Sequence, residues 1–176
     1  ILPYIENSSE EFLRDLVSRA DYVICADGGQ TIARKYDIQP DVVVGDFDST
    51  RDDFRFDCPY IEYPSEKDIT DGEAVLIHAR ELGISEVIFA GGMGGRLDHT
   101  LGMLGTLLKF HEDFASIRMI DLKNQVFILK SGSVVLPKDE AYRFFSIVPV
   151  FESASGITIT GSKYPVTDVH LDKAST

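Results

Sequence analysis

The sequence lacks several features that mark particular classes of protein. Its 176 residues include no tryptophan and only two cysteines, Cys25 and Cys58, too few for a disulfide framework or a cysteine-based zinc site. No apolar run approaches membrane-spanning length and no charged-then-apolar leader is visible at Ile1, so we expect neither a membrane segment nor a signal peptide. Cys25 stands in an apolar stretch and is expected to be a buried, inert thiol. These features favour a cytoplasmic protein.

Positive charge is scarce as well. The chain has 29 Asp and Glu residues against 17 Lys and Arg residues, which gives a formal net charge of −12 at pH 7. This balance argues against a nucleic-acid partner, because such proteins need cationic surfaces. Residues 1–75 hold 18 of the acidic residues but only 7 of the basic ones. The negative charge of this half is either a solvated face or part of a cation site.

The composition is otherwise that of a globular protein, with 44% hydrophobic residues and enough length for one domain or two small ones. Hydrophobic patterns predict strands at 22–26, 42–45, 60–63, 86–90 and 117–120, and helices near 10–19, 30–37, 70–82 and 97–108. The last helix has an apolar stripe made of Leu97, Leu101, Leu104 and Leu108. Alternating strands and helices indicate parallel βαβ units.

After residue 116 the pattern changes to short apolar runs separated by turn residues. The runs lie at 125–130, 134–136, 142–150 and 157–160. Such spacing is typical of an antiparallel sheet or half of a sandwich. We therefore expect an α/β domain over residues 1–122 and a smaller antiparallel β domain over residues 123–176.

Acidic residues follow the first two predicted strands of the α/β domain. Asp27 stands before Gly28 and Gly29, and Asp46 and Asp48 follow the run at 42–45. Because the carboxyl ends of parallel strands share one edge of a sheet, these side chains should converge. Either motif alone can be a turn or a helix cap. Together they favour a site for a hard cation, for which Mg²⁺ is usual beside phosphates.

The helix predicted at 70–82 begins with a further set of polar residues. Thr70 and Glu73 have the spacing of a capping box, which explains Thr70 and Asp71 without any ligand. The same geometry also suits a phosphate at the helix N-terminus, with Lys67 adding positive charge and Asp71 facing a metal. The spacing leaves both interpretations open.

A glycine-rich loop at 91–95 joins the strand at 86–90 to the next helix. A strand, a glycine-rich loop and a helix in this order can cradle a phosphate, and Arg96 could bind it with two hydrogen bonds. Alternatively, the loop is a flexible surface turn and Arg96 forms a salt bridge with a nearby acid. His99 is expected to be a polar residue of the helix start, because no second histidine stands at metal-ligand spacing.

Taken together, four motifs in order resemble the thiamine pyrophosphokinase family. They are Ala26-Asp27-Gly28-Gly29, Gly45-Asp46-Phe47-Asp48-Ser49, Asp68-Ile69-Thr70-Asp71 and Gly94-Gly95-Arg96-Leu97-Asp98-His99, and the segment 161–165 is also similar. The resemblance implies a Rossmann-like parallel-sheet domain followed by a β-sandwich domain that binds thiamine and takes part in dimerisation. It also implies a homodimer with active sites at its interface, which transfers pyrophosphate from ATP to the hydroxyl of thiamine with Mg²⁺, giving thiamine diphosphate and AMP.

The resemblance also implies residue roles. Asp46, Asp48 and Asp71 would be catalytic, and together with Asp27 they would hold Mg²⁺ and the phosphates. A second group would contact the nucleotide: Gly28, Gly29, Lys67, Thr70, Arg96, Asp98 and His99. The family has an Asn-Gly step after its first strand that Ile1-Leu2-Pro3 does not show, and it has further strands after residues 163–165. The thiamine contacts therefore have no predicted positions in this sequence.

Two other functions fit part of the sequence. Asp46-Phe47-Asp48-Ser49-Thr50 after an apolar strand is similar to the nucleophile motif of haloacid dehalogenase-type phosphatases, in which Asp46 would form a phospho-aspartate. That interpretation leaves Asp27-Gly28-Gly29 and the Arg96 loop without a role. A nucleotide or cation sensor without turnover is the third possibility, against which the intact acidic residues argue.

Overall fold

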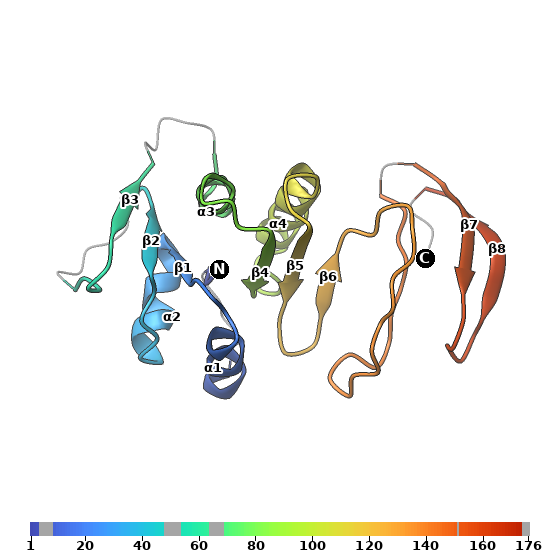
Figure 1. Cartoon of the computed structure of the whole chain (residues 1–176), viewed down its shortest axis with the longest axis horizontal. Helices are drawn as coiled ribbons and strands as arrows, with labels where there is room; N and C mark the ends of the chain where they lie inside the picture. Colours follow the sequence, from blue (N-terminus) through green and yellow to red (C-terminus); the bar gives the residue numbers. More distant parts are fainter. Residues whose placement is uncertain (4–8, 48–53, 64–68, 151, 174–176) are drawn as a thin grey trace. The chain divides into compact units, whose positions relative to one another are not determined.

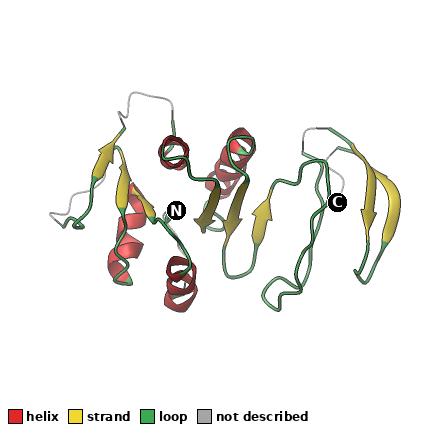
Figure 2. Cartoon of the chain, viewed as in Figure 1, coloured by secondary structure: helices red, strands yellow, loops and turns green. Residues whose placement is uncertain are grey.

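The computed structural model of the chain describes residues 1–3, 9–47, 54–63, 69–150 and 152–173. It is a mixed α/β protein with parallel strand pairs and further sheets, and it divides into two compact units, Ile1–Pro137 and Lys138–Thr176. The helices all lie in the first unit as far as the described residues go, as Figure 2 shows by colour.

The first unit contains two three-stranded sheets (Figure 1). Strands β1 (Ile24–Ala26), β2 (Val42–Gly45) and β3 (Tyr60–Glu62) are parallel and lie in the order β1-β2-β3. Strands β4 (Glu86–Ala90) and β5 (Ser116–Ile120) are also parallel, and β6 (Gln125–Phe127) joins β5 in the antiparallel direction. The predicted strands of the α/β region are thus confirmed, and none of their bounds differs by more than two residues.

The residues at the start of the chain connect these two sheets. Leu2 forms a parallel bridge with Cys25, and its carbonyl accepts a hydrogen bond of 3.0 Å from the amide of Ala26. On the other side, the amide of Ala90 donates to the carbonyl of Ile1 at 3.0 Å. Residues 1 and 2 therefore lie between β1 and β4, where the strand order changes direction, and ligands of open parallel sheets bind beside such points.

Helices cover both faces of the β1–β2 pair. Cys25 and Val43 pack in one buried cluster with side chains of α1 (Glu10–Ser18) and α2 (Gln30–Lys35). Their neighbours Val42 and Val44 pack in a second cluster with α3 (Asp71–Glu81) and α4 (Leu97–Phe110). Since successive side chains of a strand point to opposite faces, burial on both sides explains the continuous apolar run Val42–Val44.

The stripe predicted for α4 faces the core only in part: Leu104 is half-buried and packs against the second cluster, but the first two leucines of the stripe do not. Leu97 and Leu101 are 71% and 59% exposed, whereas the buried residues of this helix are Thr106, Leu107 and Phe110. The helix has apolar residues on more than one side, so hydrophobic periodicity identified the packed side only in part. None of the helices in the described ranges has the length and apolar character of a membrane span.

The second unit is built around one hairpin. Strand β7 (Ala154–Ile159) pairs antiparallel with β8 (Val166–Leu171), with register shifts along the pair. Strands were also predicted at 134–136 and 142–150, but the structure has no strand there, so those predictions were wrong. The first unit continues to Pro137, beyond the boundary expected at Leu122, because β6 pairs with β5.

Candidate active site at the carboxyl ends of the parallel strands

Two of the predicted acidic residues lie directly after adjacent strands. Asp27 opens a short 3₁₀ turn (Asp27–Gly29) after β1 and is only 6% exposed. Asp46 follows β2 and is half-buried. A Cβ atom on Gly45 would lie 2.6 Å from the Cβ atom of Asp27, closer than such atoms approach in proteins. Gly45 therefore lets the acidic end of β1 lie against the end of β2.

Asp71 reaches the same region from the first turn of α3. The hydroxyl of Thr70 accepts a hydrogen bond of 3.2 Å from the amide of Glu73, so Thr70 caps the helix as predicted. The pKa of the Asp71 carboxyl is raised, chiefly because surrounding atoms exclude water and further because Asp46 and Asp27 place negative charge nearby. The three carboxylates thus interact electrostatically.

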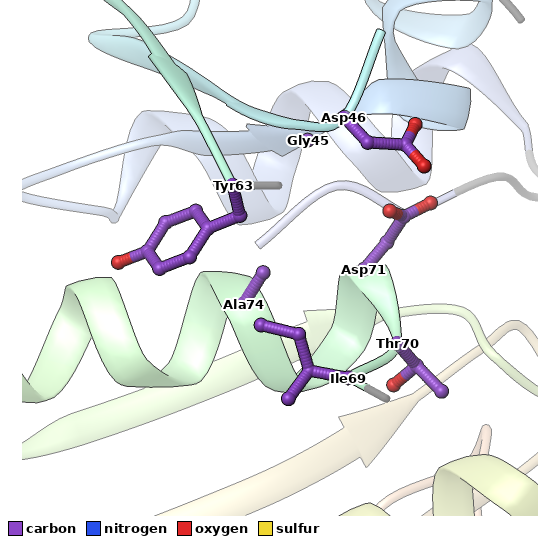
Figure 3. Close-up of a pocket in the computed structure, with 7 residues that line it drawn as sticks. All are labelled: Gly45, Asp46, Tyr63, Ile69, Thr70, Asp71 and Ala74. Carbon is purple, nitrogen blue, oxygen red and sulfur yellow. The ribbon is translucent and has the colours of Figure 1, made fainter. Parts of the chain in front are cut away.

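A pocket with an empty volume of about 290 Å³, open to solvent, lies between these elements. Figure 3 shows the carboxylates of Asp46 and Asp71 directed toward one another at one end of it. This volume includes space that is open to solvent, so the pocket is a shallow depression and not an enclosed cavity. The lining residues come from the end of β2, the residue after β3 and the start of α3: Gly45, Asp46, Tyr63, Ile69, Thr70, Asp71 and Ala74.

The backbone turns sharply just after Asp46. Phe47 has a φ of 57°, in the left-handed region that residues with a Cβ atom adopt at a cost of about 1–2 kcal/mol. Its ring packs against Tyr60 with the centroids 5.5 Å apart, which helps to hold this conformation. Such strain is common where a loop must direct side chains toward a ligand.

The described residues do not by themselves form a complete metal cage. Among them, no group of three His, Cys, Asp or Glu side chains is arranged to hold a metal ion. Asp48 and Lys67, which the sequence analysis assigned to the site, lie outside the described residues. The carboxylate pair of Asp46 and Asp71 has the oxygen ligands that a hard cation needs.

The glycine-rich loop has a backbone that requires glycine. Gly91, Gly92, Gly94 and Gly95 all have positive φ values, between 63° and 117°. The loop leads into α4, whose cap residue is Arg96.

The side chain of Arg96 is paired within this loop region. Its guanidinium donates two hydrogen bonds to the carboxylate of Asp98, at 2.5 and 3.1 Å, and lowers the pKa of Asp98 to about 2. This is the salt bridge that the sequence analysis left open as an alternative. His99 is exposed in the first turn of α4. None of these three residues lines the pocket beside Asp46.

The two glycines after Asp27 have different surroundings. A Cβ atom on Gly29 would lie 1.9 Å from the carbonyl oxygen of Leu2, so the N-terminal segment already explains this glycine. Gly28 is half-buried in the same turn.

Sequence patterns did not identify two further residues beside Asp27. The side-chain amide of Gln30 donates to Oδ1 of Asp27 at 2.9 Å, and the hydroxyl of Tyr60 donates to Oε1 of Gln30 at 3.2 Å. No motif contains either residue, and only the parallel pairing of β1, β2 and β3 brings them together.

The fold and this site define a class: an α/β protein with acidic residues gathered at the carboxyl ends of parallel strands, beside a capped helix N-terminus. Residues 13–119 match the family model described as thiamin pyrophosphokinase, catalytic domain. The thiamine pyrophosphokinase of Bacillus subtilis (strain 168) is 35% identical over 144 residues, which cover 79% of this chain and 67% of that protein.

Solved structures give the same result. The crystal structure of thiamine pyrophosphokinase from Bacillus subtilis superposes with a TM-score of 0.77 at 30% identity, covering 92% of this chain and 79% of that one. The thiamin pyrophosphokinase from Geobacillus thermodenitrificans gives a TM-score of 0.77 at 28% identity, with 96% and 79% covered. The chain belongs to the thiamin pyrophosphokinase family and is an enzyme. These findings favour neither the phosphatase nor the sensor interpretation.

Proposed function

We propose that this enzyme transfers the pyrophosphoryl group of ATP to the hydroxyl of thiamine, giving thiamine diphosphate and AMP, in a reaction that depends on Mg²⁺. The family membership supports the substrates, since the relatives are named for this activity. The observation that carries the proposal for this chain is the approach of Asp46 and Asp71 at one pocket, with Asp27 close enough to add to their repulsion.

Asp27, Asp46, Asp48 and Asp71 are the proposed Mg²⁺ site. Mg²⁺ is usually bound by one or two carboxylates together with substrate phosphates and water, so it does not need a three-residue protein cage. When bound there, the ion would neutralise charge on the phosphate oxygens during transfer. The pKa of Asp71 is raised mainly by exclusion of water and further by repulsion from Asp46 and Asp27, and a bound ion would decrease the repulsive part.

The protein's part in the reaction is mainly positioning. The thiamine hydroxyl oxygen forms a bond to the β-phosphorus of ATP as the bond from that phosphorus to the AMP oxygen breaks. The hydroxyl proton passes to a carboxylate, for which Asp48 and Asp71 are the candidates. On the nucleotide side we propose Gly28, Gly29, Lys67, Thr70, Arg96, Asp98 and His99. Arg96 would have to exchange Asp98 for a phosphate in order to contribute.

The decisive experiment is an assay of the purified protein with ATP, Mg²⁺ and thiamine, followed by separation of AMP from ADP. We expect AMP and thiamine diphosphate in equal amounts. Asp46→Asn should lower the rate by at least about 100-fold, because even outer-shell partners of a metal are worth about 10- to 100-fold. Asp113→Asn is the matched control, since Asp113 is an acid that pairs with Arg80 outside the pocket.

Two results would contradict the proposal. Formation of ADP in place of AMP would show a different transfer reaction. Full turnover by Asp46→Asn would remove Asp46 from the site.

The finer architecture is also part of the proposal. We propose that the first unit is a Rossmann-like domain that binds ATP and Mg²⁺, and that the second belongs to a β-sandwich domain that binds thiamine. We further propose a cytoplasmic homodimer with its active sites at the interface. The exposed apolar side chains of Leu97 in the first unit and Phe144 in the second, 71% and 92% exposed, support a covering partner.

A further inference from the structure

A continuous series of hydrogen bonds ends on the carboxylate of Asp27. The backbone amide of Phe56 donates to the hydroxyl of Tyr60 at 2.9 Å, and this hydroxyl donates to Oε1 of Gln30 at 3.2 Å. Nε2 of Gln30 then donates to Oδ1 of Asp27 at 2.9 Å and to its carbonyl oxygen at 3.3 Å. Gln30 and Asp27 are 8% and 6% exposed, so water competes little for these bonds.

This series of hydrogen bonds determines which group donates and which accepts at each step. Because the Phe56 amide occupies an acceptor site of the Tyr60 hydroxyl, the hydroxyl proton is available for Gln30. Oε1 of Gln30 must accept that proton, and its NH₂ group must then face Asp27. The opposite orientation would place a carbonyl oxygen against a carboxylate. The amide of Gln30 is thus held as a donor to Asp27.

Tyr60 also supports the turn that carries Asp46. Its ring lies 5.5 Å from the ring of Phe47, the residue with left-handed backbone next to Asp46. The guanidinium of Arg55 lies 4.5 Å from the Tyr60 ring centroid and 5.9 Å from that of Phe47, within the distance at which a cation is attracted to an aromatic face. Tyr60 therefore contacts both Gln30, which binds Asp27, and Phe47, which follows Asp46.

We propose that Gln30 and Tyr60 are positioning residues for the cation and phosphate site, and that they hold the Asp27 carboxylate and the Asp46–Phe47 turn in place for a divalent ion. This inference rests on the proposed function for the identity of the site. Asp27 lies close to Asp46 and Asp71, and repulsion would push it away unless a donor holds it. The Gln30 amide is such a donor, and Tyr60 prevents that amide from rotating.

The inference is tested with Gln30→Leu, which keeps the size of the side chain but removes the donor, and with Tyr60→Phe, which removes one oxygen atom. The first measurement is the affinity for Mn²⁺, used as a substitute for Mg²⁺. The concentration of free Mn²⁺ is determined from its electron paramagnetic resonance signal. The second is the Mg²⁺ concentration that half-saturates AMP formation. The third is the melting temperature without metal.

We expect Gln30→Leu to weaken Mn²⁺ binding about 10- to 100-fold and to raise the half-saturating Mg²⁺ concentration to match, with a smaller effect on the rate at saturating Mg²⁺. Tyr60→Phe should weaken binding about fivefold, the effect of one neutral hydrogen bond. Gln39→Leu is the control, because the Gln39 amide donates to the backbone carbonyls of Pro40 and Asp57. It should bind Mn²⁺ as the unchanged protein does.

The outcomes separate the two proposals. If both variants lower the melting temperature but bind Mn²⁺ with unchanged affinity, the residues are only structural and the inference is wrong. It is also wrong if the unchanged protein binds no Mn²⁺ in a saturable manner. If Mn²⁺ binding weakens as expected but the unchanged protein makes no AMP, the positioning role stands and the proposed reaction fails.

Discussion

Among single residues, Asp71 shows most directly how a residue of the candidate active site can lower the stability of the folded protein. Its carboxyl pKa is raised by exclusion of water and by the charges of Asp46 and Asp27, so its ionised form is unfavourable in the metal-free protein. We predict that Asp71→Asn raises the melting temperature of the metal-free protein at pH 7 by no more than about 2 °C, because Asp71 is exposed and water screens much of the penalty. The same change should lower AMP formation at least about 100-fold.

The pH dependence of this effect has a definite sign. A carboxyl with a raised pKa binds its proton more tightly in the folded protein, so the penalty is present at neutral pH and disappears as the pH falls through the folded-state value. The stabilisation by Asp71→Asn should therefore shrink toward pH 4 in thermal unfolding followed by circular dichroism. An equal gain at pH 7 and pH 4, or an active variant, would contradict this account.

The position of some of these residues could be predicted from the sequence and that of others could not, for a physical reason. Asp46 and Asp71 could be predicted because each stands where a strand ends or a helix begins, and these positions can be found from local patterns. Gln30 and Tyr60 are 30 residues apart and meet only through strand pairing, which leaves no local pattern. Arg96 had two possible partners, and the structure pairs it with Asp98.

At the scale of elements, α3 carries a second group with a shifted pKa besides Asp71. His78 is 8% exposed, and its Nε2 atom has no hydrogen-bond partner among the described residues. Burial lowers the pKa of His78, an effect that the charge of Glu81 only partly opposes. Protonation of this histidine therefore favours unfolding.

We predict that the contribution of His78 to stability is constant at pH values well above about 6.5, the ordinary pKa of histidine, and that it becomes unfavourable as the pH falls below that value. Between pH 7.5 and 5.5 this contribution should lower the melting temperature by up to about 2–4 °C, the change that about 1 kcal/mol makes in a protein of this size. His78→Leu should remove most of this fall. His170→Gln, at an exposed histidine of β8, should keep it. Parallel slopes for His78→Leu and the unchanged protein would refute the assignment.

The helices also show where hydrophobic patterns stop being informative. For α3, a cap residue and a C-terminal glycine mark both ends, and the structure follows them from Asp71 to Glu81, with Gly83 at a φ of 72°. For α4 the start was correct and the helix ends at Phe110, two residues beyond the predicted end, but its leucines lie on several sides of the helix. The choice between Leu101 and Leu107 as the buried residue depends on the neighbouring elements, which the sequence of the helix does not contain.

At the scale of the whole molecule, the two units differ in how they are held together. The first has buried clusters on both faces of its parallel strands. In the second, Pro149 is the one buried residue among those that the structure describes, and Phe144 is 92% exposed. A two-stranded hairpin without a core is marginally stable in water. The second unit therefore needs contacts with other parts of the protein or with a partner to remain folded.

We predict that a peptide of residues 138–176 is unfolded when isolated, because the β7–β8 hairpin has no buried apolar cluster to offset the entropy of ordering the chain. Its circular dichroism should be that of a random coil, and its amide protons should show little dispersion in NMR spectra. Residues 1–137 should unfold cooperatively, since they contain both buried clusters. A folded isolated peptide would show that the strand pairing itself suffices, and it would remove the need for a partner surface.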